Sequence, residues 1–405
     1  MSISLIGRSL KESATLKLNE VAAILRAKGE PLIHLGIGEP QSRTPIEAVT
    51  SFTGILNSGE IRYTPVDGTR EMKQAVIRYT EDYYNRHVQP ENIIISSGAK
   101  QAIMVALQAI LDPQDEVIFP SPYWVSYPEM VKLCGAVPVP VPAEDGSFYP
   151  RIEDIEQNLT GYTKAIIINS PNNPSGAVYA PQFIEDIIKL AEKESIYLIF
   201  DDIYNRLIFD GVQVTNPYDI STDDTDNSRL IVVNGISKPY AMTGFRIGWA
   251  VASRKLIEVM TNIQAHQTSG PSVLLQKAAI GAINGSQTGV ESLRETLQNN
   301  TKVMIDQLKA FDGVHVSPPD GTFYVFADFS YYNNDSEKLA KFLLDKIRVV
   351  TVPGAEFGFD GYLRLSTCTT IKDITEGIER IKWALDPNSP NELYIGERKL
   401  VRDWL

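Results

Sequence analysis

Residues 164–176 read KAIIINSPNNPSG, an apolar run followed by a turn with three asparagines and two prolines. The continuous isoleucine run is typical of a strand that is buried on both faces of a sheet. The prolines and the glycine indicate a turn directly after this strand. The asparagines place polar groups at the edge of the sheet where the strand ends, although the turn taken alone is only a loop.

Short β-branched runs of the same kind recur along the chain and alternate with helical patterns. Helices are expected at 101–111 and 182–194. Strands are expected at 92–95, 115–119, 164–168, 197–200, 230–233 and 245–251. Buried strands separated by helices predict an α/β fold with a mostly parallel sheet between layers of helices.

The pattern changes near residue 305 and predicts a second, smaller α/β unit. Its strands are expected at 314–316, 322–327, 349–352 and 362–365, and its helices at 336–346 and 371–385. We therefore expect a large domain at 46–304 and a small domain at 305–385. Residues 1–45, with a helix near 18–28, are expected to belong with the small domain, and residues 386–405 to form an extension outside the core.

The composition narrows the class of function. The chain has 405 residues and a formal net charge of −12, which argues against nucleic acid or an anionic membrane as the main partner because both need a basic face. Two cysteines and four histidines, without a CxxC pair, argue against a disulfide framework and a metal site. Because we see no signal peptide and no apolar run of about 20 residues, we expect a cytoplasmic protein.

Two segments with glycine carry groups that suit a phosphate. SSGAKQ at 96–101 lies between a strand and a helix, and the N–H groups of a helix N-terminus attract anions, although a simple tight turn explains the glycine equally. SKPY at 237–240 is followed by GFRIG at 244–248. Arg246 suits a phosphate because a guanidinium binds it bidentately. Lys238 is either a surface lysine or, when desolvated beside a cation, a nucleophilic amine.

An acidic segment, DDIY at 201–204, ends another predicted buried strand. Acids at such strand ends gather in the active-site crevices of α/β proteins. A carboxylate there can keep a pyridinium nitrogen protonated, which makes the ring an electron sink. The alternative is an acid that caps a helix.

The motifs occur along the chain in the order phosphate loop, asparagine turn, acid and lysine. In this order they resemble the class I aminotransferases, which are pyridoxal-phosphate (PLP) enzymes of the aspartate aminotransferase fold (fold type I). The patterns N-x-P-x-N-P-[ST]-G, D-x-I-Y and S-K-x-x-x-x-x-G-x-R-x-G occur in the family's order. The resemblance runs from about Thr15 to Ala384 and is strongest to the bacterial aspartate aminotransferases, some of which use prephenate. It implies that the large and small domains together form the family's fold.

The resemblance assigns the reactive centre residue by residue. It implies that Lys238 carries PLP as a Schiff base and moves the substrate's proton. Asp201 matches the partner of the pyridine nitrogen, and Tyr204 and Asn173 match donors to the phenolic oxygen of the cofactor.

The resemblance also implies contacts with the ring face and the phosphate of the cofactor. Trp124, in SPYW at 121–124, matches the aromatic residue stacked on the ring. Tyr63 matches a tyrosine that reaches the phosphate of the neighbouring subunit, which implies a homodimer with shared sites. The remaining phosphate contacts are implied for Gly98, Ala99, Lys100, Ser237 and Arg246.

The implied substrate is an amino acid with two carboxylates. Arg364, in YLRLS at 362–366, matches the clamp on the α-carboxylate. The alternative role is a surface ion pair, but the bidentate fork of a guanidinium favours the clamp. Gly38 lies near that carboxylate in the family. Lys100 and Thr15 match contacts to the side-chain carboxylate, although Thr15 also reads as a helix N-cap. Substrate contacts are implied as well for Trp124 and Asn173.

The resemblance therefore implies a ping-pong aminotransferase that moves the amino group of aspartate, or of another dicarboxylic amino acid, to a 2-oxo acid such as 2-oxoglutarate. QSR at 41–43 departs from the family in the loop that closes over the substrate, and Arg43 would add a cation there. Asp202 replaces a glutamate, which we take as neutral. Aromatic or other amino acids, or carbon–sulfur lysis by the same lysine, stay open. An effector-sensing domain of a transcription regulator would need a DNA-binding module ahead of it.

Overall fold

The computed structural model describes residues 3–10, 14–143, 147–220, 224–395 and 398–404. Its large sheet has seven strands in the order β2-β8-β7-β6-β5-β3-β4. Because only β8 runs antiparallel to its neighbours, the expected mixed, mostly parallel sheet is confirmed. The strands are β2 (Ile93–Ser96), β3 (Glu116–Ser121), β4 (Val137–Pro142), β5 (Thr163–Asn169), β6 (Tyr197–Asp201), β7 (Leu230–Gly235) and β8 (Gly248–Val251).

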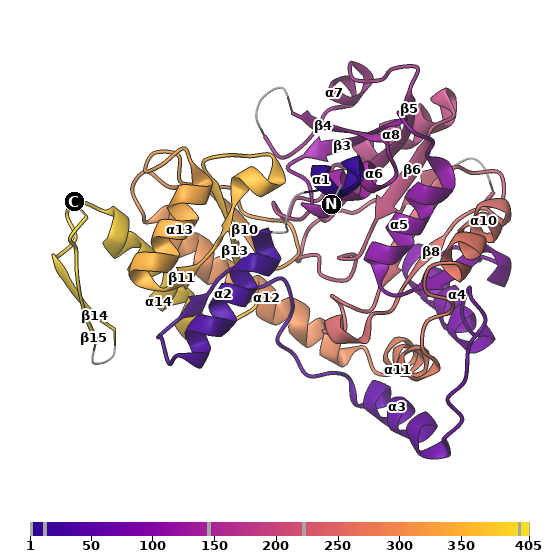
Figure 1. Cartoon of the computed structure of the whole chain (residues 1–405), viewed down its shortest axis with the longest axis horizontal. Helices are drawn as coiled ribbons and strands as arrows, with labels where there is room; N and C mark the ends of the chain where they lie inside the picture. Colours follow the sequence, from indigo (N-terminus) through magenta and orange to yellow (C-terminus); the bar gives the residue numbers. More distant parts are fainter. Residues whose placement is uncertain (1–2, 11–13, 144–146, 221–223, 396–397, 405) are drawn as a thin grey trace.

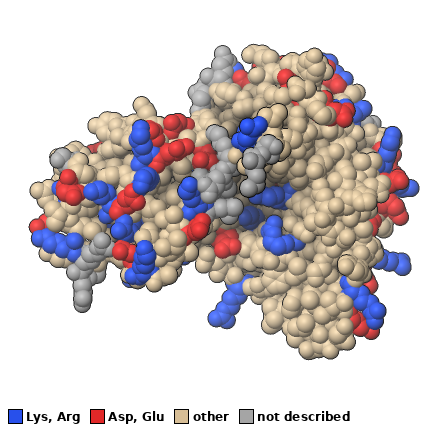
Figure 2. Space-filling view, viewed as in Figure 1, with Lys and Arg blue, Asp and Glu red and all other residues tan. Residues whose placement is uncertain are grey.

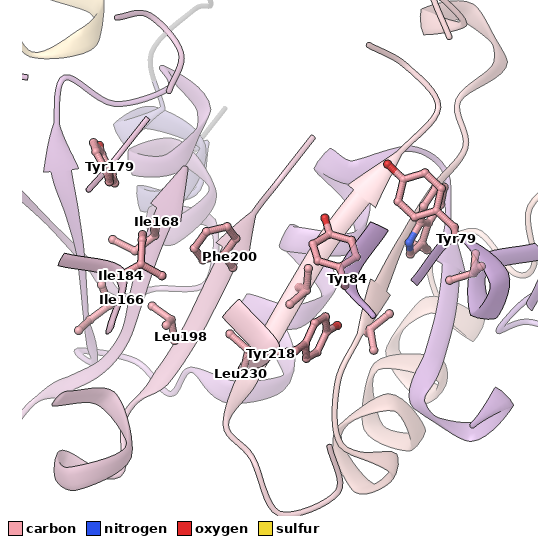
Figure 3. Close-up of a cluster of buried hydrophobic side chains, with 14 of the residues drawn as sticks. Tyr79, Tyr84, Ile166, Ile168, Tyr179, Ile184, Leu198, Phe200, Tyr218 and Leu230 are labelled. Atoms are coloured by element: carbon pink, nitrogen blue, oxygen red, sulfur yellow. The ribbon is translucent and has the colours of Figure 1, made fainter. Parts of the chain in front are cut away.

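Both faces of the central strands are buried, as their continuous apolar runs require. Ile166 and Leu198 face one hydrophobic cluster, whereas Ile167 and Ile199 face another, because successive side chains of a strand point to opposite faces. Figure 3 shows Ile166 and Leu198 in the first cluster, near Ile184 of a covering helix. The first cluster is covered by α4 (Arg70–Tyr84), α8 (Pro181–Glu194) and α11 (Val273–Asn284), and the second by α5 (Ala99–Ile110), α6 (Ser126–Leu133) and α10 (Arg254–Ala265).

A second unit lies beside the large sheet and is drawn mainly in orange and yellow in Figure 1. Its antiparallel sheet has the order β12-β13-β10-β9, with β9 (His315–Val316), β10 (Tyr324–Asp328), β12 (Val352–Pro353) and β13 (Tyr362–Ser366). Its helices are α13 (Ser336–Ile347) and α14 (Ile371–Leu385). The long helix α12 (Thr288–Lys309) bridges the units, since Val290 packs in the first cluster of the large sheet and Met304 in the core of the second unit.

The N-terminal chain packs on this second unit. β1 (Ile33–His34) pairs in parallel with β11 (Val349–Val350), and α2 (Ala14–Ala27) contacts β12. The domain limits expected from the sequence stay a prediction. The remaining helices are α1 (Leu5–Ser9), α3 (Ile46–Ser58), α7 (Ile152–Glu156) and α9 (Pro217–Ile220), with 3₁₀ turns at 90–92, 243–245 and 354–357. Within the described ranges, no helix combines the length and the apolar character that crossing a membrane requires.

The structure corrects three strand expectations. β8 begins at Gly248 and not at Phe245, because a 3₁₀ turn and then the left-handed Arg246, with φ of 50°, interrupt the run. Residues 349–352 form two short strands that pair in different sheets. β4, with the sequence VPVPVP, was not expected to be a strand. It tolerates its prolines because it lies at the edge of the sheet.

The C-terminal extension ends in a hairpin of β14 (Glu392–Ile395) and β15 (Arg398–Val401), seen beside the C-terminus in Figure 1. The extension is not wholly outside the core, because Leu393, Leu400 and Trp404 pack against the hydrophobic cluster of the second unit. The Trp404 ring lies edge-on to Phe342 and Trp383, with centroid distances of 5.5 and 5.6 Å. Trp404 therefore anchors the extension.

We expect Trp404→Ala to destabilise the protein by about 2 kcal/mol, because it removes a half-buried aromatic ring that packs against two others. Urea unfolding followed by circular dichroism measures this effect. Tyr394→Ala is the matched control, since Tyr394 is on the same hairpin and 63% exposed, and should change stability by less than about 0.5 kcal/mol. Equal midpoints for Trp404→Ala and the parent protein would contradict the anchoring role.

Candidate active site

A cavity of about 540 Å³ lies at the edge of the large sheet where several parallel strands end. Asn169 and Asp201 are the last residues of β5 and β6, Lys238 follows β7, and Trp124 follows β3. Among the described residues, five lysines and arginines and two acids line the cavity, in a chain that is acidic overall. Figure 2 shows Lys and Arg side chains in the hollow between the two lobes of the molecule. The cavity is therefore suited to an anionic ligand.

Lys238 presents its amine to this cavity from the loop after β7. Its Nζ donates a hydrogen bond to the carbonyl oxygen of Gly38 at 2.6 Å. Burial lowers the pKa of Lys238 to about 8, which the nearby Cys368 opposes and the Arg364 guanidinium reinforces. A substantial fraction of the amine is consequently unprotonated near neutral pH, and only this form is a nucleophile.

Asp201 lies buried at the bottom of the cavity, with one oxygen paired and the other not. Its Oδ2 accepts a hydrogen bond from the hydroxyl of Tyr127 at 2.6 Å, whereas its Oδ1 has no partner among the described residues. Burial raises the pKa of Asp201 to about 6, which hydrogen bonds from Tyr127 and the Ile203 backbone and the charge of Lys238 counteract. A buried carboxylate oxygen of this kind needs a donor from a ligand, and a cationic donor would favour its ionised form.

The N-terminus of α5 forms a cradle for an anion. Gly98 precedes this helix with φ of 91° and provides no side-chain cap for its first N–H groups. A Cβ on Gly98 would lie 2.5 Å from Nη2 of Arg246, and a Cβ on Gly248 would lie 2.2 Å from the nitrogen of Ala99. Both glycines are needed for this approach, which brings helix N–H groups and a guanidinium to one place. Arg246 donates to the carbonyl of Thr243 at 2.9 Å.

Lys100 and Trp124 lie together on one wall. The Nζ of Lys100 is 4.8 Å from the centroid of the Trp124 ring, within the range of a cation–π contact. Trp124 packs edge-on against Tyr127, with 5.4 Å between centroids. Burial and the charge of Arg246 lower the pKa of Lys100. An anionic ligand group can replace the indole ring as the partner of this ammonium.

Arg364, on β13, is a buried cation at the opposite wall. Its Nη1 donates to Oδ1 of Asn173 at 2.9 Å, and its Nη2 to the carbonyl of Gly36 at 3.4 Å. The Tyr324 ring lies 4.2 Å from the guanidinium carbon. Among the described residues Nε has no partner, and burial lowers the pKa of the group. A buried guanidinium without a carboxylate is costly, so it is suited to an anionic ligand.

The structure brings most of the predicted residues together. The cavity is lined by Gly38, Ala99, Lys100, Trp124, Asn173, Asp201, Tyr204, Ser237, Lys238, Arg246 and Arg364. Gly98 lies directly behind Arg246. Tyr63 does not line the cavity of its own chain and is 98% exposed. Thr15 is in the first turn of α2, but its side chain lies outside the described residues. Arg43 lines a separate cavity, so the cation expected from it at the substrate site stays a prediction.

Several lining or supporting residues were not predicted from the sequence. Tyr127 reads as an apolar helix residue, and nothing in its spacing points to Asp201. Tyr324, whose hydroxyl accepts from that of Tyr204 at 3.4 Å, reads as part of a core strand. His34 carried a usable signal, because a single histidine in the apolar run LIHLGIG is unusual in a core. Asn19 and Arg26 line the cavity from α2 and gave no signal beyond a polar helix face.

Comparison with known proteins gives one consistent family. The sequence model for aminotransferase class I and II matches residues 30–381. An aspartate aminotransferase of Bacillus sp. (strain YM-2) is 37% identical over 380 residues, 92% of this chain and 96% of that protein. A probable aspartate/prephenate aminotransferase of Aquifex aeolicus is 36% identical, covering 93% and 97%. The structure of the Thermus thermophilus aspartate aminotransferase with maleate matches with a TM-score of 0.89 at 35% identity, covering 94% and 99%.

We expect Lys238 of the ligand-free protein to react with an amine-acylating reagent at lower pH than exposed lysines such as Lys189. Because burial lowers its pKa to about 8, its labelling should rise steeply between about pH 7 and 9. Lys189 is the internal control, since its contact with Glu185 raises its pKa. Mass spectrometry of each labelled lysine reads both profiles from one sample. Coincident profiles would contradict the lowered pKa.

Proposed function

Because the chain belongs to the class I and II aminotransferase family, we propose that it is a PLP-dependent aspartate aminotransferase. It moves the amino group of aspartate, or of another dicarboxylic amino acid, to a 2-oxo acid such as 2-oxoglutarate. The observation that carries this proposal is the meeting of three groups in one cavity. They are the Lys238 amine with its lowered pKa, the Asp201 oxygen and the Arg364 guanidinium. The described residues give that oxygen no partner and that guanidinium no carboxylate.

The residues present fit PLP. The unpartnered Oδ1 of Asp201 suits a protonated pyridine nitrogen, and the cradle at Gly98 and Arg246 suits a phosphate. Because Asn173 accepts from Arg364 with its amide oxygen, its NH₂ group is available as a donor to the phenolic oxygen. Bound PLP supplies an aldehyde that links to amines and a ring that accepts the electrons released at the substrate α-carbon.

Lys238 has two tasks in this proposal. Its amine would hold PLP when the cofactor is bound. Once free, the same amine would accept the proton of the substrate α-carbon and release it later in the reaction. A pKa of about 8 suits both tasks, because the amine needs to gain and lose a proton near neutral pH. Asp201 contributes by keeping its negative charge next to the pyridine nitrogen.

Arg364 orients the substrate. Its side chain is fixed by Asn173 and Tyr324, so a carboxylate that binds it is held in one orientation, with the α-carbon toward Lys238. Both the amino acid and the 2-oxo acid have this carboxylate. One cavity can therefore serve both half-reactions, in which the first product leaves before the second substrate binds, as ping-pong kinetics require.

The preference for a dicarboxylic substrate rests on Lys100 and Thr15. Lys100 presents an ammonium to the cavity beside Trp124, where it can bind the side-chain carboxylate. The related Thermus protein was solved with maleate, itself a dicarboxylate, which supports the same chemistry here. We keep Thr15 as the second contact.

We also propose that the protein works as a homodimer in which Tyr63 completes the partner's site. Tyr63 is 98% exposed, although the next residue is anchored, since Thr64 donates to the carbonyl of Pro271 at 2.9 Å. A large aromatic side chain held out into solvent on an anchored loop is suited to a contact with another chain. In the proposed dimer its hydroxyl reaches the phosphate of the cofactor.

A panel of amino donors with 2-oxoglutarate tests the proposed activity. We expect aspartate and glutamate to give the highest kcat/KM, because Lys100 and Arg364 can bind both of their carboxylates. Formation of each 2-oxo acid is measured by a coupled assay. Preferred use of aromatic or branched donors would contradict the dicarboxylate preference. Release of ammonia from a cysteine-type substrate without an acceptor would instead indicate a carbon–sulfur lyase.

Arg364→Lys should raise the KM of both substrates about 100-fold, because a lysine cannot replace a bidentate fork and a hydrogen bond between charged groups contributes about 1.5–3 kcal/mol. Steady-state kinetics with each substrate measures this effect. Arg348→Lys is the control, since Arg348 pairs with Glu30 away from the cavity and should leave both KM values unchanged. An unchanged KM in Arg364→Lys would contradict the proposal that Arg364 binds the substrate carboxylate.

Hybrid dimers test the role of Tyr63. We expect Tyr63→Ala to weaken cofactor binding and Lys238→Ala to abolish turnover. Mixed subunits of the two variants should regain parent-like cofactor affinity in half of their sites, because the intact Lys238 then receives Tyr63 from the other chain. Cofactor titration of co-expressed, doubly tagged dimers measures this recovery. If the hybrids bind the cofactor no more tightly than Tyr63→Ala dimers do, Tyr63 does not act across the interface.

A further inference from the structure

His34 is a buried polar residue within the apolar strand β1. Its Nδ1 accepts a hydrogen bond from the backbone N–H of Gly36 at 3.1 Å. A Cβ on Gly36 would lie 3.2–3.3 Å from His34, Val350 and Val352, so the turn is tightly enclosed. The N–H of Gly36 would lose its partner if the ring were removed, and an unpaired buried N–H is costly.

The hydrogen bond defines the protonation of His34. Because Nδ1 accepts, it carries no proton, and the ring proton is on Nε2. Burial lowers the pKa of His34 to about 4, and the charges of Arg26 and Arg364 act in the same direction. The ring is therefore neutral in the pH range in which aminotransferases are assayed, and Nδ1 stays available as an acceptor.

The backbone that His34 holds is the backbone to which the two reactive cations bind. The carbonyl of Gly36 accepts from Nη2 of Arg364 at 3.4 Å, and the carbonyl of Gly38 accepts from Nζ of Lys238 at 2.6 Å. Directly before Gly36, the carbonyl of Leu35 accepts from the N–H of Ser366, two residues beyond Arg364, at 2.6 Å. Residues 34–38 thus connect β13 with the loop that carries Lys238.

We propose that His34 is a positioning residue for the substrate-carboxylate clamp: through Gly36 it fixes the carbonyl that orients the Arg364 guanidinium. The inference rests on the proposed function for the role of Arg364. Asn173 fixes one end of the fork, and Gly36 fixes the other. Loss of the Nδ1 acceptor frees Gly36 to shift, so that the fork points less accurately at a carboxylate. The cost falls on substrate binding, since the guanidinium holds the carboxylate throughout the reaction.

Three substitutions separate this role from packing. His34→Asn keeps an acceptor near the place of Nδ1, whereas His34→Gln has similar polarity but carries its amide nearer to the place of Nε2. Val350→Ala opens a cavity beside the same turn, because Val350 is the partner of His34 in the β1–β11 ladder, and it leaves the acceptor intact. Each variant is measured as the holoenzyme, for thermal stability, for kcat and KM, and for succinate binding by calorimetry.

We expect His34→Gln to raise KM for amino acid and 2-oxo acid about fivefold, the effect of one neutral hydrogen bond. Its kcat should change less than about twofold, because binding is lost equally in the ground and transition states. The affinity for succinate should fall by the same factor. His34→Asn should stay within about twofold of the parent in all three quantities, and Val350→Ala should lose thermal stability while its KM stays unchanged.

Each contrary result overturns the proposal. An unchanged KM in His34→Gln would do so, as would a defect in His34→Asn as large as in His34→Gln, or an equal rise of KM in Val350→Ala. Succinate binding needs no turnover, so it tests His34 even if no donor is transaminated. If succinate binds the parent but no donor reacts, the proposed function fails and the role of His34 is still decided.

Discussion

Parallel pairing of β3, β5, β6 and β7 is the constraint on which the rest of the structure depends. Parallel strands end at the same edge of a sheet, so residues far apart in the sequence meet there without any further device. Asp201 ends β6, and the loops after β3, β5 and β7 supply Trp124, Asn173 and Lys238. The second unit contributes Arg364 and Tyr324 to the cavity, so that the edge of the sheet is enclosed between the two units.

The site concentrates positive charge in a protein with a net charge of −12. Lys238, Arg364 and Arg246 lie around a single buried carboxylate, and desolvation dominates the pKa shifts of both Lys238 and Asp201. This imbalance is unfavourable by itself, since the oxygens that accept hydrogen bonds from these cations are neutral. It becomes favourable when a phosphate and a substrate carboxylate supply the missing negative charge. Stability and function therefore impose opposite demands on these residues, as at other active sites.

The sequence was sufficient for those features that a local pattern determines. Buried strands such as 164–168 and 197–200 were predicted within about two residues, and α14 at its ends. The motif residues from Gly98 to Arg246, most of which line the cavity, were predicted because the order of their motifs resembles a known family. Features that depend on contacts across the chain were not predictable. The proline-rich β4 is a strand only because it pairs with β3 at the sheet edge.

Supporting residues escaped prediction for a related reason. Tyr127 supports the site through its contacts with Asp201 and Trp124. His34 lines the cavity and holds the backbone of Gly36. None of these contacts leaves a spacing in the sequence. Arg43, in the loop that departs from the family, lines a separate cavity, and its expected substrate contact stays a prediction. Local motifs thus pointed to the groups that we propose to react, whereas the contacts that hold those groups were visible only in the three-dimensional structure.

The central claim concerns one bond, between Lys238 and the cofactor. Reduction of the PLP-loaded protein with borohydride makes such a bond permanent, and digestion with mass spectrometry locates it. The account predicts that the pyridoxyl group is found on Lys238 alone, because the amine of the neighbouring Lys100 lies against the Trp124 ring. A pyridoxyl group on Lys100, on any other lysine, or on none would contradict the account.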